Sequence, residues 1–172
     1  AEKIAQEAIN VIAEKIKNLN TLNIIVAGKT GVGKSTLINS VFKEKLADTG
    51  MGKPVTSHMR KITKKDVPLA IYDTRGFELG KEVQAEVKQE VMDTISKGLA
   101  TQDINKAIHC IWYCINTASN RIEPEEIEWL RELSMENQIT QVPIIVVLTQ
   151  SLKKKKAQEM RQVLLNENLD II

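Results

Sequence analysis

The chain has 172 residues, which is enough to bury one sizeable core and points to a single domain. The net charge is +2 with 27% charged residues, so no strong field argues for nucleic acid or acidic lipid as a partner. DNA binding is not indicated, and RNA or membrane contact has no support in the composition. Aromatic residues make up 3%, so the core must consist mainly of Ile, Val and Leu, as in the parallel sheets of α/β proteins.

The N-terminal stretch has the spacing of an amphipathic helix. We expect residues 1–20 to form a leading helix that packs on its own domain, which we place at residues 21–172. The alternative is a helix that links this domain to preceding sequence or to a partner. The apolar positions at helical spacing are Ile4, Ala8, Val11, Ile12, Ile16 and Leu19.

A glycine-rich motif follows the first predicted strand. Residues 28–35 read GKTGVGKS, after an apolar run at 22–27 and before an apolar-periodic segment at 36–42. Strand, glycine-rich turn and helix form the context in which this pattern predicts a phosphate-binding loop. Its backbone N–H groups and the helix N-terminus would surround an anion. Lys34 would supply a positive charge for the β- and γ-phosphates, and the Ser35 hydroxyl could ligate Mg²⁺.

Further strands and helices are expected to alternate along the chain. Such alternation predicts βαβ units and an α/β fold of three layers, αβα, with a mainly parallel sheet. In such sheets ligands bind beyond the carboxyl ends of the strands. The expected strands lie at 60–64 (an edge strand), 69–72, 107–115 and 142–148, and the expected helices follow at 83–95, from Pro124 and from Lys153.

The cysteines and histidines show no metal-site spacing. Cys110 and Cys114 lie on one predicted strand and point to the same face, too far apart to bridge readily. We interpret them as reduced, buried thiols of a cytoplasmic protein, and we see no signal peptide and no apolar run of membrane-spanning length. His109 is expected in or on the sheet, and a catalytic role for His58 is not favoured.

A second motif, Asp73-Thr74-Arg75-Gly76, follows the apolar run at 69–72. A carboxylate at the end of a buried strand is typical of the residue that holds Mg²⁺ in nucleotide-binding loops of this kind. Gly76 would let the backbone approach a terminal phosphate. Between the two motifs, Thr56 could reach Mg²⁺ and an attacking water from a loop that becomes ordered with the γ-phosphate, and Ser57 is the competing assignment.

The three motifs, in this order and at these intervals, resemble the guanine-nucleotide-binding domains of translation-factor-type GTPases. The Era-like branch is the most similar, and Asp73-Thr74-Arg75-Gly76-Phe77 is similar to septins. The resemblance covers about residues 22–149 and implies a P-loop NTPase fold of the Ras-like G-domain type. That fold has a further strand, which would begin near Leu169, so we expect the chain to lack the last strand.

The resemblance also implies roles for individual residues. Lys34, Thr56 and Gly76 would serve catalysis, and Ser35, Thr56 and Asp73 would hold Mg²⁺. GTP and GDP would be the ligands. The residues expected to bind nucleotide are Lys29, Thr30, Gly31, Val32, Gly33, Lys34, Ser35, Thr36, Thr149 and Gln150.

Two positions depart from the family pattern. Phe77 stands where Ras-like members carry a glutamine that orients the attacking water, so intrinsic hydrolysis should be slow or need a partner group or a dimer; Arg75 and Glu78 are the nearby polar candidates. The family reads guanine with an [NT]-K-x-D box, which here reads Thr149-Gln150-Ser151-Leu152. Leu152 cannot accept the hydrogen bonds that an aspartate accepts from guanine, which weakens the expected preference for GTP.

Three hypotheses follow. The first is a GTP-binding domain that hydrolyses GTP slowly and works as a switch, with an unknown effector or activating protein and a possible homodimer. The second is a P-loop ATPase, or an NTPase with relaxed base specificity, motivated by Leu152. The third is an interaction or assembly module that holds nucleotide with negligible turnover, which Phe77 would permit.

Overall fold

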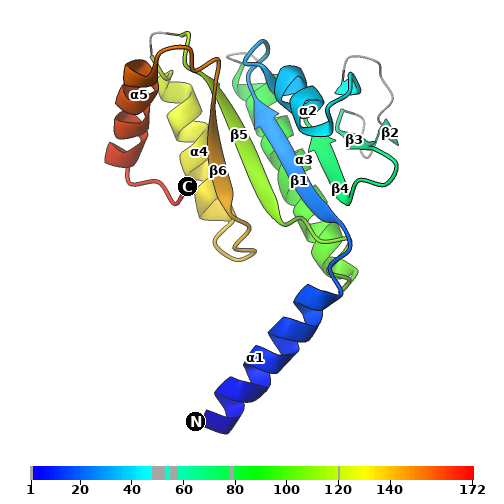
Figure 1. The fold of residues 1–172 in the computed structure, drawn as a ribbon. Coiled ribbons are helices and arrows are strands. Elements are labelled where there is room, and N and C mark those ends of the chain that lie inside the picture. The colour runs from blue at the N-terminus through cyan, green and yellow to red at the C-terminus, as the bar shows by residue number, and fades with distance from the viewer. Residues whose placement is uncertain (1, 48–52, 55–57, 78–79, 120) are drawn as a thin grey trace.

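A computed structural model describes residues 2–47, 53–54, 58–77, 80–119 and 121–172. Its first element, α1 (Glu2–Lys17), extends away from the rest of the chain (Figure 1). Ile4, Ile9 and Val11 are 74%, 57% and 49% exposed. The expectation that this helix packs on its own domain is therefore wrong. Apolar periodicity predicts which face of a helix favours burial, but it does not say what the face packs against.

Six strands form one sheet in the order β2-β3-β4-β1-β5-β6. The pairs β1–β4, β1–β5 and β5–β6 are parallel, whereas β2–β3 and β3–β4 are antiparallel. The expected mainly parallel sheet is confirmed, but the predicted edge strand is not at the edge, because β2 lies outside it. The strands are β1 (Leu22–Gly28), β2 (Lys53–Pro54), β3 (Arg60–Thr63), β4 (Leu69–Asp73), β5 (Cys110–Asn116) and β6 (Ile144–Thr149).

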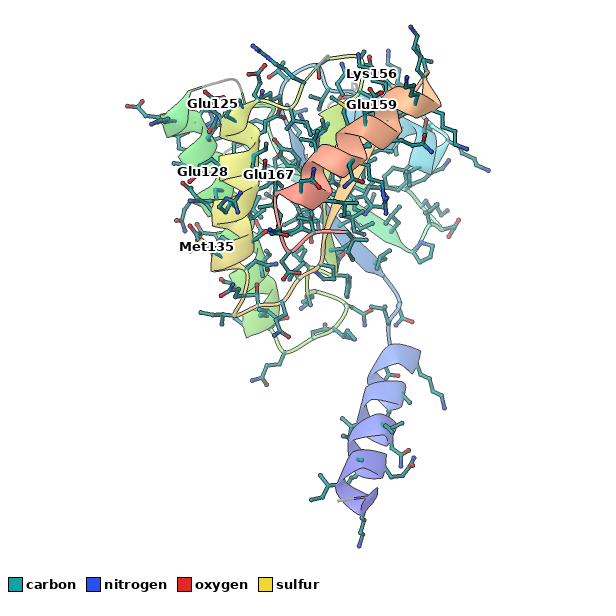
Figure 2. All side chains as sticks on the ribbon, turned by 90° about the vertical axis from the view of Figure 1, so that its left-hand side faces the viewer. Glu125, Glu128, Met135, Lys156, Glu159 and Glu167 are labelled. Carbon is teal, nitrogen blue, oxygen red and sulfur yellow. The ribbon has the colours of Figure 1, made fainter. Side chains whose placement is uncertain are left out.

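Helices cover both faces of the sheet, as the three-layer expectation required (Figure 1). On one face α2 (Lys34–Phe42) buries Ile38 and Phe42 against β1, β3 and β4. The other face carries the larger core cluster, under α3 (Lys81–Ala100), α4 (Pro124–Glu136) and α5 (Lys154–Asn166). Figure 2 shows α4 and α5 on one side of the molecule, with Glu125, Glu128 and Met135 along α4. None of the described helices is both long and apolar enough to cross a membrane.

The last residue pairs with the outer side of β6. The Ile172 N–H donates to the carbonyl of Ile144 at 2.8 Å, and the Val146 N–H donates to the carbonyl of Ile172 at 2.8 Å. Ile172 lies within the segment from Leu169 onward in which the further strand of the fold was expected to begin.

The parallel strands bring the predicted motifs together. The glycine-rich loop follows β1, Asp73 ends β4 and Thr149 ends β6. These three carboxyl ends lie at the same edge of the sheet, since the strands run in the same direction. Both cysteines are free; Cys114 belongs to the smaller core cluster on the α2 side, and Cys110 packs against that cluster.

Candidate nucleotide-binding site

The loop between β1 and α2 presents a helix N-terminus without its own cap. Gly33 occupies the N-cap position with a φ of 96°, a left-handed conformation that favours glycine. Within the described residues no side chain caps this end, and the first turn of α2 holds no acidic residue. The unpaired N–H groups and the positive end of the helix dipole are therefore available to an anion. Thr30, Gly31 and Thr36 are exposed around this end, and Ser35 is half-buried.

Lys34 and Asp73 lie close enough for their charges to interact. The Lys34 ammonium is buried and donates to the carbonyl of Gly28 at 3.1 Å. Burial lowers its pKa, while the charges of Asp73 and Cys114 act in the opposite direction. Burial raises the pKa of Asp73 to about 6, against the attraction of Lys34 and Arg60. The Asp73 Oδ1 atom is buried and accepts no hydrogen bond from the described residues, so one carboxylate oxygen at this strand end is open to a ligand.

Arg60 is a cation beside Asp73 that the sequence motifs do not predict. It lies directly opposite Asp73 in the β3–β4 register, and opposite residues of an antiparallel pair share a face of the sheet. Arg60 is exposed, and its charge counteracts the effect of burial on the Asp73 carboxyl by lowering its pKa. The next residue, Lys61, points to the other face, where its ammonium lies 5.6 Å from the centre of the Tyr72 ring. Only the strand register brings Arg60 to Asp73.

The segment after Asp73 runs along the phosphate loop. Thr74 continues the pairing with β1 by donating its N–H to the Val26 carbonyl at 3.1 Å. Phe77 forms a parallel bridge with Lys29. Its ring is fully buried, with its centre 5.1 Å from that of Trp129. Phe77 is therefore a core residue, and it leaves no polar group at this position to orient water.

Two charged side chains near the loop are already paired. Arg75, a polar candidate for hydrolysis, forms an ion pair with Glu86 of α3. The Lys29 ammonium lies 3.1 Å from Glu126 Oε2 of α4. The predicted nucleotide contact of Lys29 is therefore left to its backbone, because its side chain is engaged with α4. No sequence motif links residues 29 and 126, so this ion pair could not be predicted from the sequence.

Thr149 ties residues 149–152, which are predicted to read the base, to the glycine-rich loop. Its hydroxyl lies within hydrogen-bond distance of the Val32 carbonyl, and 3.2 Å from that of Ile115. Gln150 is exposed and has a φ of 51°. Its side-chain Nε2 lies near Gly33, 3.9 Å from the point that a Cβ would occupy if Gly33 carried a side chain. Leu152 is 93% exposed, and its side chain offers no hydrogen-bonding group. A pocket of about 350 Å³ lies beside this box, lined by residues that include Gly33, Thr36, Leu37, Thr149 and Gln150.

Other predicted residues have simpler outcomes. Thr56, its competitor Ser57, and Glu78 lie outside the described residues. His109 accepts a hydrogen bond from the Asn23 N–H at 2.8 Å, which fits the expected structural role at the sheet. No group of three or more His, Cys, Asp or Glu side chains that could hold a metal occurs in the described part of the chain. A divalent ion would therefore need hydroxyl and phosphate oxygens in addition to Asp73.

The fold and these motifs define a P-loop GTPase domain. The profile of the family described as "50S ribosome-binding GTPase" matches residues 23–150, and the chain belongs to this family. By sequence the chain is similar to septins, as the DTRGF motif predicted. "Cell division control protein 10" of Candida albicans is 26% identical over 170 residues, with 84% of this chain and 46% of the relative covered. Human "Septin-9" is 29% identical over 177 residues, with 87% and 30% covered.

The chain therefore spans less than half the length of these curated relatives. Among solved structures, Toc33 from Arabidopsis thaliana in complex with Mg²⁺ and GMPPNP has a TM-score of 0.56 and 20% identity. That match covers 90% of this chain and 64% of Toc33. At this identity the similarity shows the fold alone.

Proposed function

We propose that the chain is a GTP-binding domain that hydrolyses GTP slowly to GDP and phosphate and works as a nucleotide-controlled switch. The observation that carries the proposal is the meeting of three features at one sheet edge. These are the uncapped N-terminus of α2, the buried Lys34 ammonium, and the Asp73 carboxylate with one unpartnered oxygen. The first two attract phosphate, and the third suits a divalent cation.

The donor set fits Mg²⁺, because the buried Oδ1 of Asp73 has no hydrogen-bond partner among the described residues and Ser35 supplies a hydroxyl in the first turn of α2. Ser35, Thr56 and Asp73 would hold the ion, which would neutralise charge on the β- and γ-phosphates. Lys34 would bind these phosphates, and Gly76 would donate its N–H to the γ-phosphate. Residues 29–36 would surround the phosphates through their backbone, and Thr149 and Gln150 would flank the base.

Slow turnover follows from the position of Phe77. Its buried ring cannot hydrogen-bond an attacking water, and Arg75 is paired with Glu86. Any faster hydrolysis would need a group from a partner or from a second copy of the chain. We propose a homodimer as one such arrangement. Within the GTPases, the assignment to the Era-like branch is a proposal that rests on the sequence motifs. The similarity to septins has the support of the sequence relatives.

Relaxed base specificity is the second candidate. The exposed apolar side chain of Leu152 favours it, because the box then lacks the carboxylate that would distinguish guanine from adenine. A third candidate, an assembly module with negligible turnover, draws on the same burial of Phe77. A cytoplasmic location is proposed from the two unpaired cysteines.

Isothermal titration with Mg-GDP tests the proposal. The wild-type chain should bind, and Lys34→Ala should abolish binding, since the buried ammonium group beneath the loop is removed. Equal heats in the two proteins would refute the proposed site. Displacement of labelled GDP by ATP as efficiently as by GTP would establish the relaxed-specificity alternative, and background phosphate release with every candidate partner would establish the third.

A further inference from the structure

Glu126 differs from the other glutamates at the start of α4. Glu125 and Glu128 are exposed and point outward from the helix (Figure 2). The Glu126 side chain is turned inward and is 6% exposed, opposite a Lys29 side chain that is 17% exposed. Removing two charges from water costs free energy. A buried ion pair offsets this cost only if further hydrogen bonds satisfy its remaining polar atoms.

Those further hydrogen bonds are present. Glu126 Oε1 accepts from the Tyr113 hydroxyl at 3.1 Å, and Oε2 accepts from the Glu123 N–H at 3.3 Å. The second of these bonds belongs to the capping box that begins α4. Burial and the Glu126 charge raise the pKa of Tyr113 well above its usual value, so its hydroxyl keeps its proton and remains a donor. One carboxylate therefore caps α4 and holds the phosphate loop.

Lys29 also has contacts in two directions. One leads to Lys34, which is proposed to bind phosphate, and the other leads to the hydrophobic core. On the ligand side, its carbonyl lies 3.5 Å from the Lys34 ammonium, which is the group that attracts phosphate. On the core side, its backbone is bridged to Phe77, whose ring packs on Trp129 of α4. Phosphates that draw the Lys34 ammonium toward them would loosen its contact with the Lys29 carbonyl. The loop backbone at Lys29 would then shift, and the ion pair of the Lys29 side chain with Glu126 would carry this shift to α4.

We propose that Lys29 and Glu126 form a positioning pair, which joins the phosphate loop to the first turn of α4 so that phosphate binding in the loop is transmitted to that helix. The inference rests on the proposed nucleotide binding. Neither side chain contacts the phosphates in this account. The pair acts by fixing the loop backbone at residue 29 to the helix start at residue 126.

Hydrogen–deuterium exchange of the peptide covering residues 121–130 tests the inference, with and without saturating Mg-GDP. In the wild-type chain, nucleotide should slow exchange in this peptide by about tenfold. The variant to compare is Lys29→Met/Glu126→Gln, because replacing both members of a buried pair by neutral groups of similar size preserves stability better than removing one. The amide that replaces the Glu126 carboxylate retains one oxygen, for Tyr113 or for the Glu123 N–H, and exchange is compared at Mg-GDP concentrations that calorimetry shows to saturate each protein. The protection of the double variant at α4 should fall to less than about twofold.

Two further variants make the result specific. Lys29→Arg keeps the charge and should keep the protection, whereas Glu125→Gln removes an exposed carboxylate from the same turn and should change nothing. If the wild-type chain binds Mg-GDP without slowing exchange at α4, or if the double variant is protected as strongly as wild type, the inference is wrong while the proposed function stands. If calorimetry shows no binding by the wild-type chain, the proposed function fails first and the inference with it.

Discussion

Gly76 and Thr30 approach so closely that no side chain fits between them. A Cβ on Gly76 would lie 2.6 Å from Thr30 Oγ1 and 2.8 Å from Thr30 Cα. The second distance involves backbone, which cannot give way as a flexible side chain can. Glycine at position 76 thus allows the segment after Asp73 to approach the backbone of the phosphate loop this closely.

Gly76→Ala should therefore separate the segment after Asp73 from the phosphate loop. We expect an unfolding free energy lower by about 1–3 kcal/mol, as for other overpacked sites. Affinity for a non-hydrolysable GTP analogue should fall by about tenfold or more, with a smaller loss for GDP, because the Gly76 N–H is proposed to contact the γ-phosphate. Calorimetry with both nucleotides measures this. Gly80→Ala is the matched control, since its nearest neighbour would lie 3.9 Å away, and equal losses for the two nucleotides would argue against the γ-phosphate role.

Leu152→Asp should restore discrimination between guanine and adenine. The added carboxylate can accept the two hydrogen bonds that guanine offers and adenine does not, and charged hydrogen bonds of this kind are worth about 1.5–3 kcal/mol. The ratio of the ADP to the GDP dissociation constant should rise by about tenfold to 100-fold. Ser151→Asp adds the same charge at the neighbouring exposed position and should leave the ratio unchanged. A ratio that rises in neither variant would mean that the base does not lie over this box.

The unliganded protein should lose stability as pH rises through the titration of Asp73. Burial raises the pKa of Asp73 from 3.8 to about 6, so between these values the folded state binds more protons than the unfolded state. Stability then falls with rising pH across this window, by up to about 3 kcal/mol, and is flat above it. Urea unfolding of the wild-type chain and Asp73→Asn measures the effect as the difference between the two pH profiles. Parallel profiles would contradict it.

The predicted division at residue 20 can be tested by removing α1. The described side chains of this helix are exposed, so a chain beginning at Asn18 should unfold with a free energy within about 0.5 kcal/mol of the full chain. Asn18 is retained because its carbonyl accepts a hydrogen bond from Asn105 at 3.0 Å. The urea midpoint is the measurement, and a clear drop would show that α1 contributes to the fold.

The local part of this structure could be predicted from sequence. The GKTGVGKS pattern placed a turn between β1 and α2, Pro124 marked the start of α4, and runs of Ile, Val and Leu placed the inner strands. Each of these signals depends on neighbours within a few residues. The ends of strands were harder to place, since β5 begins at Cys110 rather than at Ala107, where backbone pairing and not apolar composition decides the boundary.

The contacts across the sheet could not be predicted in this way. Arg60 reaches Asp73 only through the β3–β4 register, and Lys29 reaches Glu126 only because the fold brings the loop after β1 next to α4. Glu126 is an acidic residue in the first turn of α4, a position that suits a solvated side chain equally well. The exposed position of α1 could not be predicted for a related reason, because an apolar face does not show which surface it packs against.

The central claim is that the residues between β1 and α2 hold the phosphates of a guanine nucleotide. The most direct measurement is an amide nitrogen–proton correlation spectrum of the labelled protein, recorded during titration with Mg-GDP. The account predicts that the largest shifts fall on the amides of residues 31–36, with no such change in Lys34→Ala. Saturable binding with the largest shifts elsewhere in the chain, or an unchanged spectrum at millimolar Mg-GDP, would contradict it.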